Sequence, residues 1–122
     1  MFVYGSLKRG FQNNPLLGTA TFVAEDRLLD HKMFSLGGYP GIIYYPNKNL
    51  VISGELFVVD SPTLTRLDQL EGHPNHYERK FLTLASGRRA WTYIYKQDTK
   101  SRPVLEDGNW VMPESLKKFW QR

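Results

Sequence analysis

The residues Phe2–Gly10, FVYGSLKRG, begin with a short apolar strand that runs directly into a loop containing two glycines. Glycine allows backbone conformations and close approaches that a side chain would block. A loop that follows a buried strand can also direct its amide N–H groups toward an anion or a carbonyl oxygen. The stretch therefore has two interpretations: a cradle for a small ligand, or an ordinary turn in which Ser6 satisfies backbone groups.

This loop lacks the spacing of the common phosphate-binding loops. It matches neither the GxxxxGK[ST] pattern of a P-loop nor the GxGxxG pattern of a dinucleotide site. Ser6 is a poor candidate nucleophile, because no Gly-x-Ser-x-Gly turn surrounds it and no base can be assigned to it. If the loop binds a ligand, we expect Ser6 to position that ligand.

Short runs of β-forming residues occupy much of the chain and are separated by turn compositions such as NNP, LGGYPG, PNKN and SGRR. They predict about six strands, over residues 1–4, 19–24, 42–45, 51–59, 80–85 and 90–96. With two short helices, these strands predict an α+β fold whose mixed sheet curls toward a small barrel. We expect residues 1–122 to form one domain, because no linker or internal repeat interrupts them.

The segment SPTLTRLDQLEGHP predicts a helix over residues 62–71. Ser61 can cap its start, proline fits the first helical position, and Gly72 followed closely by another proline ends it. A second helix is predicted over residues 113–120, where leucine, phenylalanine and tryptophan would form an apolar side.

An acidic residue falls on the apolar side of the first predicted helix. At about 100° per residue, with Leu64 at zero, Leu67 lies near 300° and Glu71 near 340°. This places the Glu71 carboxylate between two core leucines in the last helical turn, where burial and the helix dipole both raise its pKa. Such an acid can exchange protons near neutral pH. Alternatively, the helix frays at Leu70 and Glu71 turns into water.

Composition and charge limit the classes of function. The chain has 122 residues, of which 41% are hydrophobic, and no cysteine, so disulfides and thiolate zinc sites are excluded. Its three histidines are scattered, and we expect no metal. The net charge of +4 is spread over separate basic pairs, which argues against nucleic-acid binding. No segment resembles a signal peptide or a membrane span of about 20 apolar residues, so we expect a cytoplasmic protein.

Four segments together carry a family resemblance: VYGSLKRG, a strand with GEL, LDQLEGHPNHYER and the late aromatic strand WTYIY. They resemble the γ-glutamylcyclotransferase-like family over residues 2–110, and the loop YGSLKRGFQNN is most similar to the γ-glutamylamine cyclotransferase branch. The family's opening motif, YG[ST]LxxG, is present as Tyr4, Gly5, Ser6, Leu7 and Gly10.

The resemblance implies an activity and a catalytic residue. The family's glutamate follows an LDxxE-type helix end and precedes a YxR motif, which here implies Glu71 followed by Tyr77 and Arg79. The implied reaction converts a small γ-glutamyl amide to 5-oxoproline, through attack of the substrate's own α-amine, without a cofactor. Glu71 would act as base and then as acid. The amides of Gly5–Leu7 would hold either the α-carboxylate or the developing oxyanion, and both possibilities stay open.

Several further residues have both a structural and a functional interpretation. Strand alternation puts Tyr93 and Tyr95 on one face, where Tyr95 either lines a pocket or packs in the core. Gly54 indicates either a bulge or a close backbone approach, and Glu55 is a strand-face acid or a partner of the site. Arg79 could pair with an acid or cap a carbonyl.

Two loops are less informative. Tyr39 and Pro40 form a turn that the family often places near the pocket mouth, and we expect His73 and His76 at the surface. Two other functions stay open: a non-catalytic binding protein for a small acidic metabolite, and a protein interaction module. The interaction module predicts an exposed apolar patch and no pocket.

Overall fold

The computed structural model describes residues 1–47 and 49–111. The predicted helix over residues 113–120 lies outside the described residues. The described elements, in chain order, are β1 (Phe2–Val3), the 3-10 helix η1 (Asn14–Leu17), β2 (Thr21–Leu29), β3 (His31–Ser35), β4 (Pro40–Tyr44), β5 (Val51–Val58), α1 (Ser61–Glu71), β6 (Tyr77–Thr83), β7 (Arg89–Tyr95) and β8 (Val104–Leu105).

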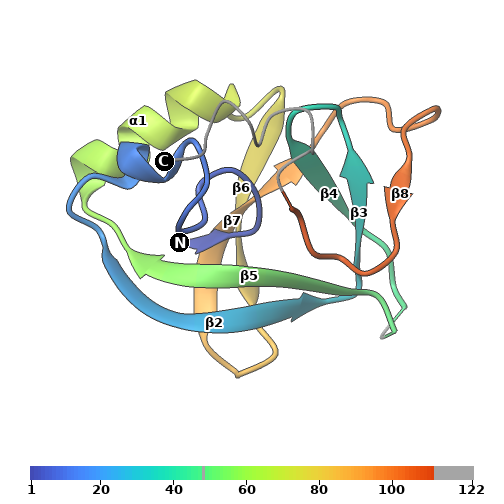
Figure 1. Cartoon of the computed structure of the whole chain (residues 1–122), viewed down its shortest axis with the longest axis horizontal. Coiled ribbons are helices and arrows are strands. Elements are labelled where there is room, and N and C mark those ends of the chain that lie inside the picture. Colours follow the sequence, from blue (N-terminus) through green and yellow to red (C-terminus); the bar gives the residue numbers. More distant parts are fainter. Residues whose placement is uncertain (48, 112–122) are drawn as a thin grey trace.

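The strands form three sheets, with orders β1-β5-β2, β4-β3-β8 and β6-β7. The long β2–β5 pair curves along one side of the molecule, and α1 lies on the opposite side with β1 between them (Figure 1). The α+β class predicted from the sequence is confirmed. Among residues 1–47 and 49–111 the paired strands are all antiparallel, and they include β3 and β8, which the sequence did not predict.

Helix α1 starts and ends at well-defined caps. The Asp60 side chain accepts a hydrogen bond from the Thr63 amide at 2.8 Å, so the cap is Asp60 and the prediction of Ser61 was wrong by one position. Gly72 adopts a left-handed conformation (φ 63°) that an L side chain disfavours, and its N–H donates to Gln69 at 3.2 Å. The helix is therefore regular through Glu71 and does not fray at Leu70.

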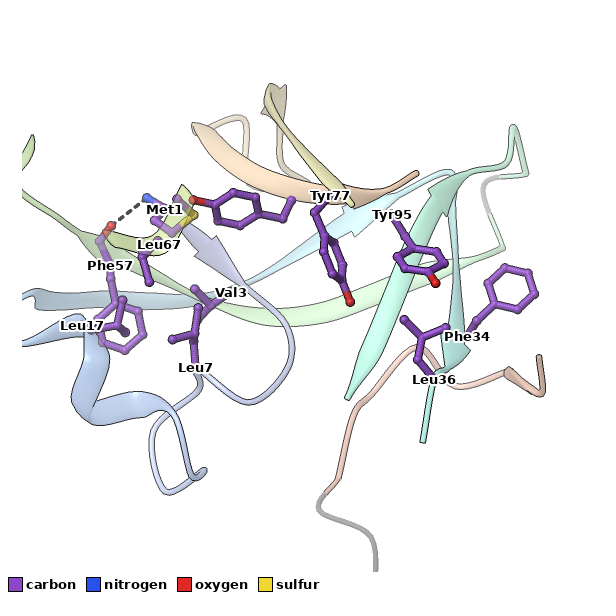
Figure 2. Close-up of a cluster of buried hydrophobic side chains, with 11 residues drawn as sticks. Met1, Val3, Leu7, Leu17, Phe34, Leu36, Phe57, Leu67, Tyr77 and Tyr95 are labelled. Atoms are coloured by element: carbon purple, nitrogen blue, oxygen red, sulfur yellow. Dashed lines mark hydrogen bonds between the residues drawn. The ribbon is translucent and has the colours of Figure 1, made fainter. Parts of the chain in front are cut away.

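One buried cluster joins the helix, the first strand and the aromatic end of the β6–β7 hairpin. Leu67 of α1 is 1% exposed, and burial of a leucine contributes about 1.5–3 kcal/mol, which anchors the helix. In the same cluster the Met1 ammonium donates to the Phe57 carbonyl at 2.8 Å (Figure 2). Tyr77 and Tyr95 lie side by side, with ring centres 5.2 Å apart (Figure 2).

Gly54 lets β1 lie directly against β5. A Cβ atom at this position would come within 2.5 Å of the Phe2 ring and 2.6 Å of the Val3 carbonyl oxygen. Of the two alternatives that the sequence left for Gly54, the structure shows the close backbone approach. Because β1 leads into the loop at Gly5–Gly10, this contact also sets where that loop begins.

Candidate functional site

A pocket of about 260 Å³ opens where the loop after β1, the end of α1 and the β6–β7 hairpin meet. The loop contributes Tyr4 to Leu7, the helix contributes Leu70 and Glu71, and the hairpin and the loop preceding it contribute His76, Tyr77 and Tyr93. The segment Gly38–Pro40 borders the opening. The pocket thus combines segments that are far apart in the sequence, from Phe2 to Tyr93.

Most of the residues predicted for the site line this pocket. They are Tyr4, Gly5, Ser6, Leu7, Glu71 and Tyr77. Gly10 is not among the lining residues; it is a turn residue with a φ of 83°. Tyr95 does not line the pocket either. It is buried, and its ring packs edge-on against Tyr77 and His76, so it supports the wall from behind.

In the loop after β1, the carbonyl groups accept hydrogen bonds from within the protein, whereas three amides do not donate one within the described residues. The Ser6 carbonyl accepts from the Asn13 amide at 2.9 Å, and the Leu7 carbonyl accepts from the Asn14 side chain at 2.9 Å. The backbone N–H groups of Gly5, Ser6 and Leu7 have no acceptor among residues 1–47 and 49–111. This loop can therefore donate to an anionic or carbonyl oxygen.

Gly5 is required by a close contact. A Cβ atom at Gly5 would lie 2.8 Å from Pro40 Cγ, so a side chain there would push the loop away from the Gly38–Pro40 segment. The same contact brings Pro40 to the pocket. The turn that contains Tyr39 and Pro40 thus lies at the pocket, one of the two alternatives that the sequence left open.

Two basic residues fasten the far side of the loop. Lys8 is buried, and its ammonium donates to the Trp110 carbonyl at 2.7 Å; burial lowers its pKa. Glu55 accepts from the Arg9 amide at 2.8 Å and from Arg9 Nε at 3.3 Å. Glu55 is therefore a partner of the loop, one of the two interpretations that its sequence allowed.

Glu71 is the acidic side chain among the described residues that line the pocket. Burial raises its pKa from 4.5 to about 7. Of the residues that the structure describes, none donates a hydrogen bond to its carboxylate, so the charged form is not compensated. Leu67 is buried as the helical phase predicted, whereas Leu70 is 49% exposed at the pocket.

Three tyrosine hydroxyls at the pocket each donate to an acceptor within the protein. Tyr4 donates to the Tyr93 carbonyl at 2.6 Å, and Tyr77 donates to the Pro40 carbonyl at 2.8 Å. Tyr93 donates to Asp68 Oδ1 at 2.7 Å. Burial is the main cause that raises the pKa of all three phenols, and nearby groups, Asp68 for Tyr93 and Glu71 for all three, raise it further, so the phenols stay neutral.

Behind Tyr93 lies an ion pair that connects α1 to β6. Arg79 Nε donates to Asp68 Oδ1 at 2.9 Å, and Arg79 Nη2 donates to Oδ2 at 3.1 Å. Arg79 thus pairs with an acid, which is one of the two roles that its sequence allowed. Sequence reasoning did not assign Asp68 to the site, although its place in LDQLE, one helical turn before Glu71, was the available signal.

The histidines occupy different environments. His73 is partly buried and its Nδ1 accepts from the Arg79 amide at 3.0 Å, so its expected surface position is wrong. His76 is exposed, as expected, and also lines the pocket.

Within residues 1–47 and 49–111, no group of three or more His, Asp or Glu side chains is arranged to hold a metal ion. None of the helices in this part of the chain is long and apolar enough to cross a bilayer.

Known proteins resemble this chain over nearly its whole described length. The family described as "Gamma-glutamyl cyclotransferase, AIG2-like" matches residues 1–112. The γ-glutamylcyclotransferase family protein YtfP of Escherichia coli K12 is 31% identical over 111 residues, covering 91% of this chain and 95% of the relative. The corresponding protein of Citrobacter rodentium is 32% identical, covering 91% of this chain and 94% of the relative.

Solved structures share the fold. The solution structure of E. coli YtfP has a TM-score of 0.72 and 27% identity, covering 91% of this chain and 95% of that one. The crystal structure of a mouse AIG2-like protein has a TM-score of 0.67 and 27% identity, covering 87% of this chain and 84% of that one. The chain therefore belongs to the γ-glutamyl cyclotransferase, AIG2-like family.

Proposed function

We propose that this protein converts a γ-glutamyl amine or γ-glutamyl amino acid to 5-oxoproline and a free amine. The observation that carries the proposal is the partly buried Glu71 carboxylate, whose pKa is raised to about 7, in the same pocket as three unpaired loop amides. An acid with this pKa is suited to proton transfer at neutral pH. The amides are suited to an anionic oxygen.

The chemistry is an intramolecular acyl transfer. The substrate's α-nitrogen attacks its own γ-carbonyl carbon, a new C–N bond closes the five-membered ring, and the C–N bond to the leaving amine breaks. Glu71 accepts the proton that the α-nitrogen loses and returns it to the leaving nitrogen. The reaction needs no cofactor, because one C–N bond forms as another breaks and a single proton is transferred. The pocket accelerates it by holding the flexible glutamyl chain in the attacking pose.

Ser6 has a positioning role in this scheme. Its hydroxyl oxygen accepts from Asn13 Nδ2 at 2.8 Å, so its own O–H is available to donate to the substrate. None of the hydrogen bonds of Ser6 within the described chain involves a base that could activate it. We therefore assign Ser6 to substrate binding, beside the Gly5 and Leu7 amides.

The decisive experiment measures 5-oxoproline release from a panel of γ-glutamyl amines and γ-glutamyl amino acids. Glu71→Gln preserves the size of the side chain and removes its titration, so we expect a folded protein with activity lower by at least about 10²-fold. Unchanged release by this variant would contradict the mechanism.

A second candidate function is binding of a small acidic metabolite without turnover. The unpaired amides of Gly5–Leu7 favour it, because they can hold a carboxylate by themselves. The partly buried Glu71 carboxylate favours turnover, because its negative charge would repel an acidic ligand and because a site for binding alone does not need an acid with a raised pKa. Binding of panel members with no release of 5-oxoproline would support this second function.

A further inference from the structure

A second cavity, of about 310 Å³, lies on the far side of the loop that follows β1. It is lined by one loop residue, by facing positions of β2 and β5, and by one residue after β8: Lys8, Glu25, Asp26, Arg27, Ser53, Gly54, Glu55 and Asn109. None of these residues lines the pocket that contains Glu71. Small-molecule sites have volumes of about 300–1,000 Å³, so the cavity can hold a small ligand. Its charged and polar lining indicates a polar ligand.

Lys8 brings a buried positive charge to this cavity, and that charge has no ion pair among the residues that the structure describes. Its ammonium contacts only neutral groups: the Trp110 carbonyl at 2.7 Å, Asn109 Oδ1 at 3.4 Å and the Phe11 ring at 4.7 Å. Burial lowers the pKa of Lys8 more than the charge of Glu55 raises it. Because lysine is rarely buried without a partner for its charge, this environment favours an anion.

Arg27 brings a second positive charge to the same cavity from a different element. It lies on β2, opposite Ser53 of β5, and its side chain is exposed. Within the described chain the Arg27 guanidinium has no hydrogen bond and no ion pair, since only its backbone groups are bonded. A guanidinium offers parallel N–H donors that match the two oxygens of a carboxylate or a phosphate.

The acids that line the cavity already have basic partners. Arg9 lies 3.7 Å from Glu25 and 3.3 Å from Glu55, and its Nε donates to the latter. Asp26 lies 3.8 Å from Arg88 Nη1. Neither of these arginines lines the cavity. The unpaired charges that face the cavity are therefore positive.

We propose that this cavity binds a small oxyanion, a carboxylate or a phosphate, between the Lys8 ammonium and the Arg27 guanidinium. The Ser53 hydroxyl and the Asn109 side-chain amide supply further donors at the same cavity. The site uses neither Glu71 nor the loop amides, so it is separate from the proposed reaction. Because Lys8 directly follows Leu7 in the chain, a bound anion would hold the loop from its far side.

NMR titrations with inorganic phosphate and, separately, with acetate locate the anion and distinguish the two oxyanion chemistries. We expect saturable shifts of the backbone amide signals of Ser53 and Asn109 with at least one of the two anions. The signals of Gly5–Leu7 report any binding in the pocket of Glu71, so the two cavities are observed separately. Shifts confined to Gly5–Leu7, or no saturation by either anion at millimolar concentration, would overturn the site.

A pair of arginine variants distinguishes the site from general attraction of anions to a basic protein. Arg27→Gln removes a guanidinium from an exposed position, and we expect anion binding at Ser53 and Asn109 to weaken by at least about tenfold. Arg102→Gln removes the same charge from an exposed position outside the cavity, and there we expect a change within about twofold. Equal losses in the two variants would overturn the site.

Lys8→Met tests the second cation, because it removes the ammonium and keeps an unbranched apolar side chain. It also removes the hydrogen bond to the Trp110 carbonyl, so thermal melts must first show that the variant folds. We expect the folded variant to lose the shifts at Ser53, and unchanged binding would contradict the role of Lys8. If it does not fold, the Arg27→Gln comparison decides alone. These measurements of binding do not depend on release of 5-oxoproline, so the site and the proposed reaction can fail independently.

Discussion

Arg79 and Asp68 form a two-point ion pair, with donor–acceptor distances of 2.9 and 3.1 Å, and Asp68 also accepts the hydroxyl of Tyr93. The pair therefore connects α1 to both strands of the β6–β7 hairpin. Both side chains are mostly buried, at 17% exposure for Arg79 and 23% for Asp68. Removing one partner of such a pair therefore costs more free energy of unfolding than removing one partner of an exposed surface pair.

We predict that Arg79→Met lowers the free energy of unfolding by about 1–3 kcal/mol, because it leaves Asp68 with an uncompensated charge. Urea unfolding at neutral pH measures the change. Lys96→Met is the control, since Lys96 and Glu78 form a more exposed pair at 3.6 Å, and there we expect at most about 1 kcal/mol. Equal losses in the two variants would contradict a special role for the Arg79–Asp68 pair.

The raised pKa of Glu71 predicts that the protein becomes less stable as the pH rises toward neutral. Its pKa is raised by burial from 4.5 to about 7, so the folded protein favours the protonated form. Stability contributed by protonation is present at low pH and is lost as pH rises from about 4.5 through about 7. Between about pH 4 and pH 8, the free energy of unfolding of the parent protein should fall by roughly 3 kcal/mol relative to that of Glu71→Gln. A stability difference that is independent of pH would contradict this prediction.

The same titration predicts the acid limb of the activity profile. If Glu71 must be ionised to accept a proton, kcat/KM should rise with pH, with a midpoint near 7. The phenols do not titrate in this range, because burial raises the pKa of Tyr4, Tyr77 and Tyr93 above its usual value. Initial rates of 5-oxoproline release between about pH 5 and pH 9 test this. A profile without an inflection near 7 would exclude Glu71 as the base.

Gly54→Ala tests whether the contact between β1 and β5 supports the loop. The added methyl would lie 2.6 Å from the Val3 carbonyl oxygen and 2.5 Å from the Phe2 ring, so β1 must shift. We expect a loss of about 1–3 kcal/mol in unfolding free energy, typical of overpacking. Gly38→Ala is the stability control, because no atom lies within 4 Å of a Cβ at that position. A Gly54→Ala variant as stable as the control would contradict the contact.

Local patterns predicted α1 and the inward position of Glu71. The helical phase depends only on residues within two turns of each other, and the glycine at position 72 marks the end of the helix in the sequence itself. The cap was assigned one residue late because Asp60 and Ser61 are both good capping residues. Strand β3 was missed because its burial does not alternate: His31, Met33 and Phe34 are all buried.

The contacts between elements that are distant in the sequence could not be predicted from local patterns. Alternation puts Tyr93 and Tyr95 on one face, but it does not say which of them lies over the pocket. That depends on where β7 crosses β1, through contacts such as Thr92 Oγ1 donating to the Phe2 carbonyl at 3.0 Å. Asp68 likewise gains its role from Arg79, on a different element.

The hydrogen bond from Lys8 to the Trp110 carbonyl joins residues 102 positions apart, and that from Tyr4 to Tyr93 joins residues 89 positions apart. During synthesis the loop leaves the ribosome before Tyr93 and Trp110, the residues whose carbonyl groups fasten it. Contacts across such separations form only after long loops have closed. A partly synthesised chain therefore carries the loop amides long before it carries Tyr93, which lines the pocket, and Trp110, which fastens the loop.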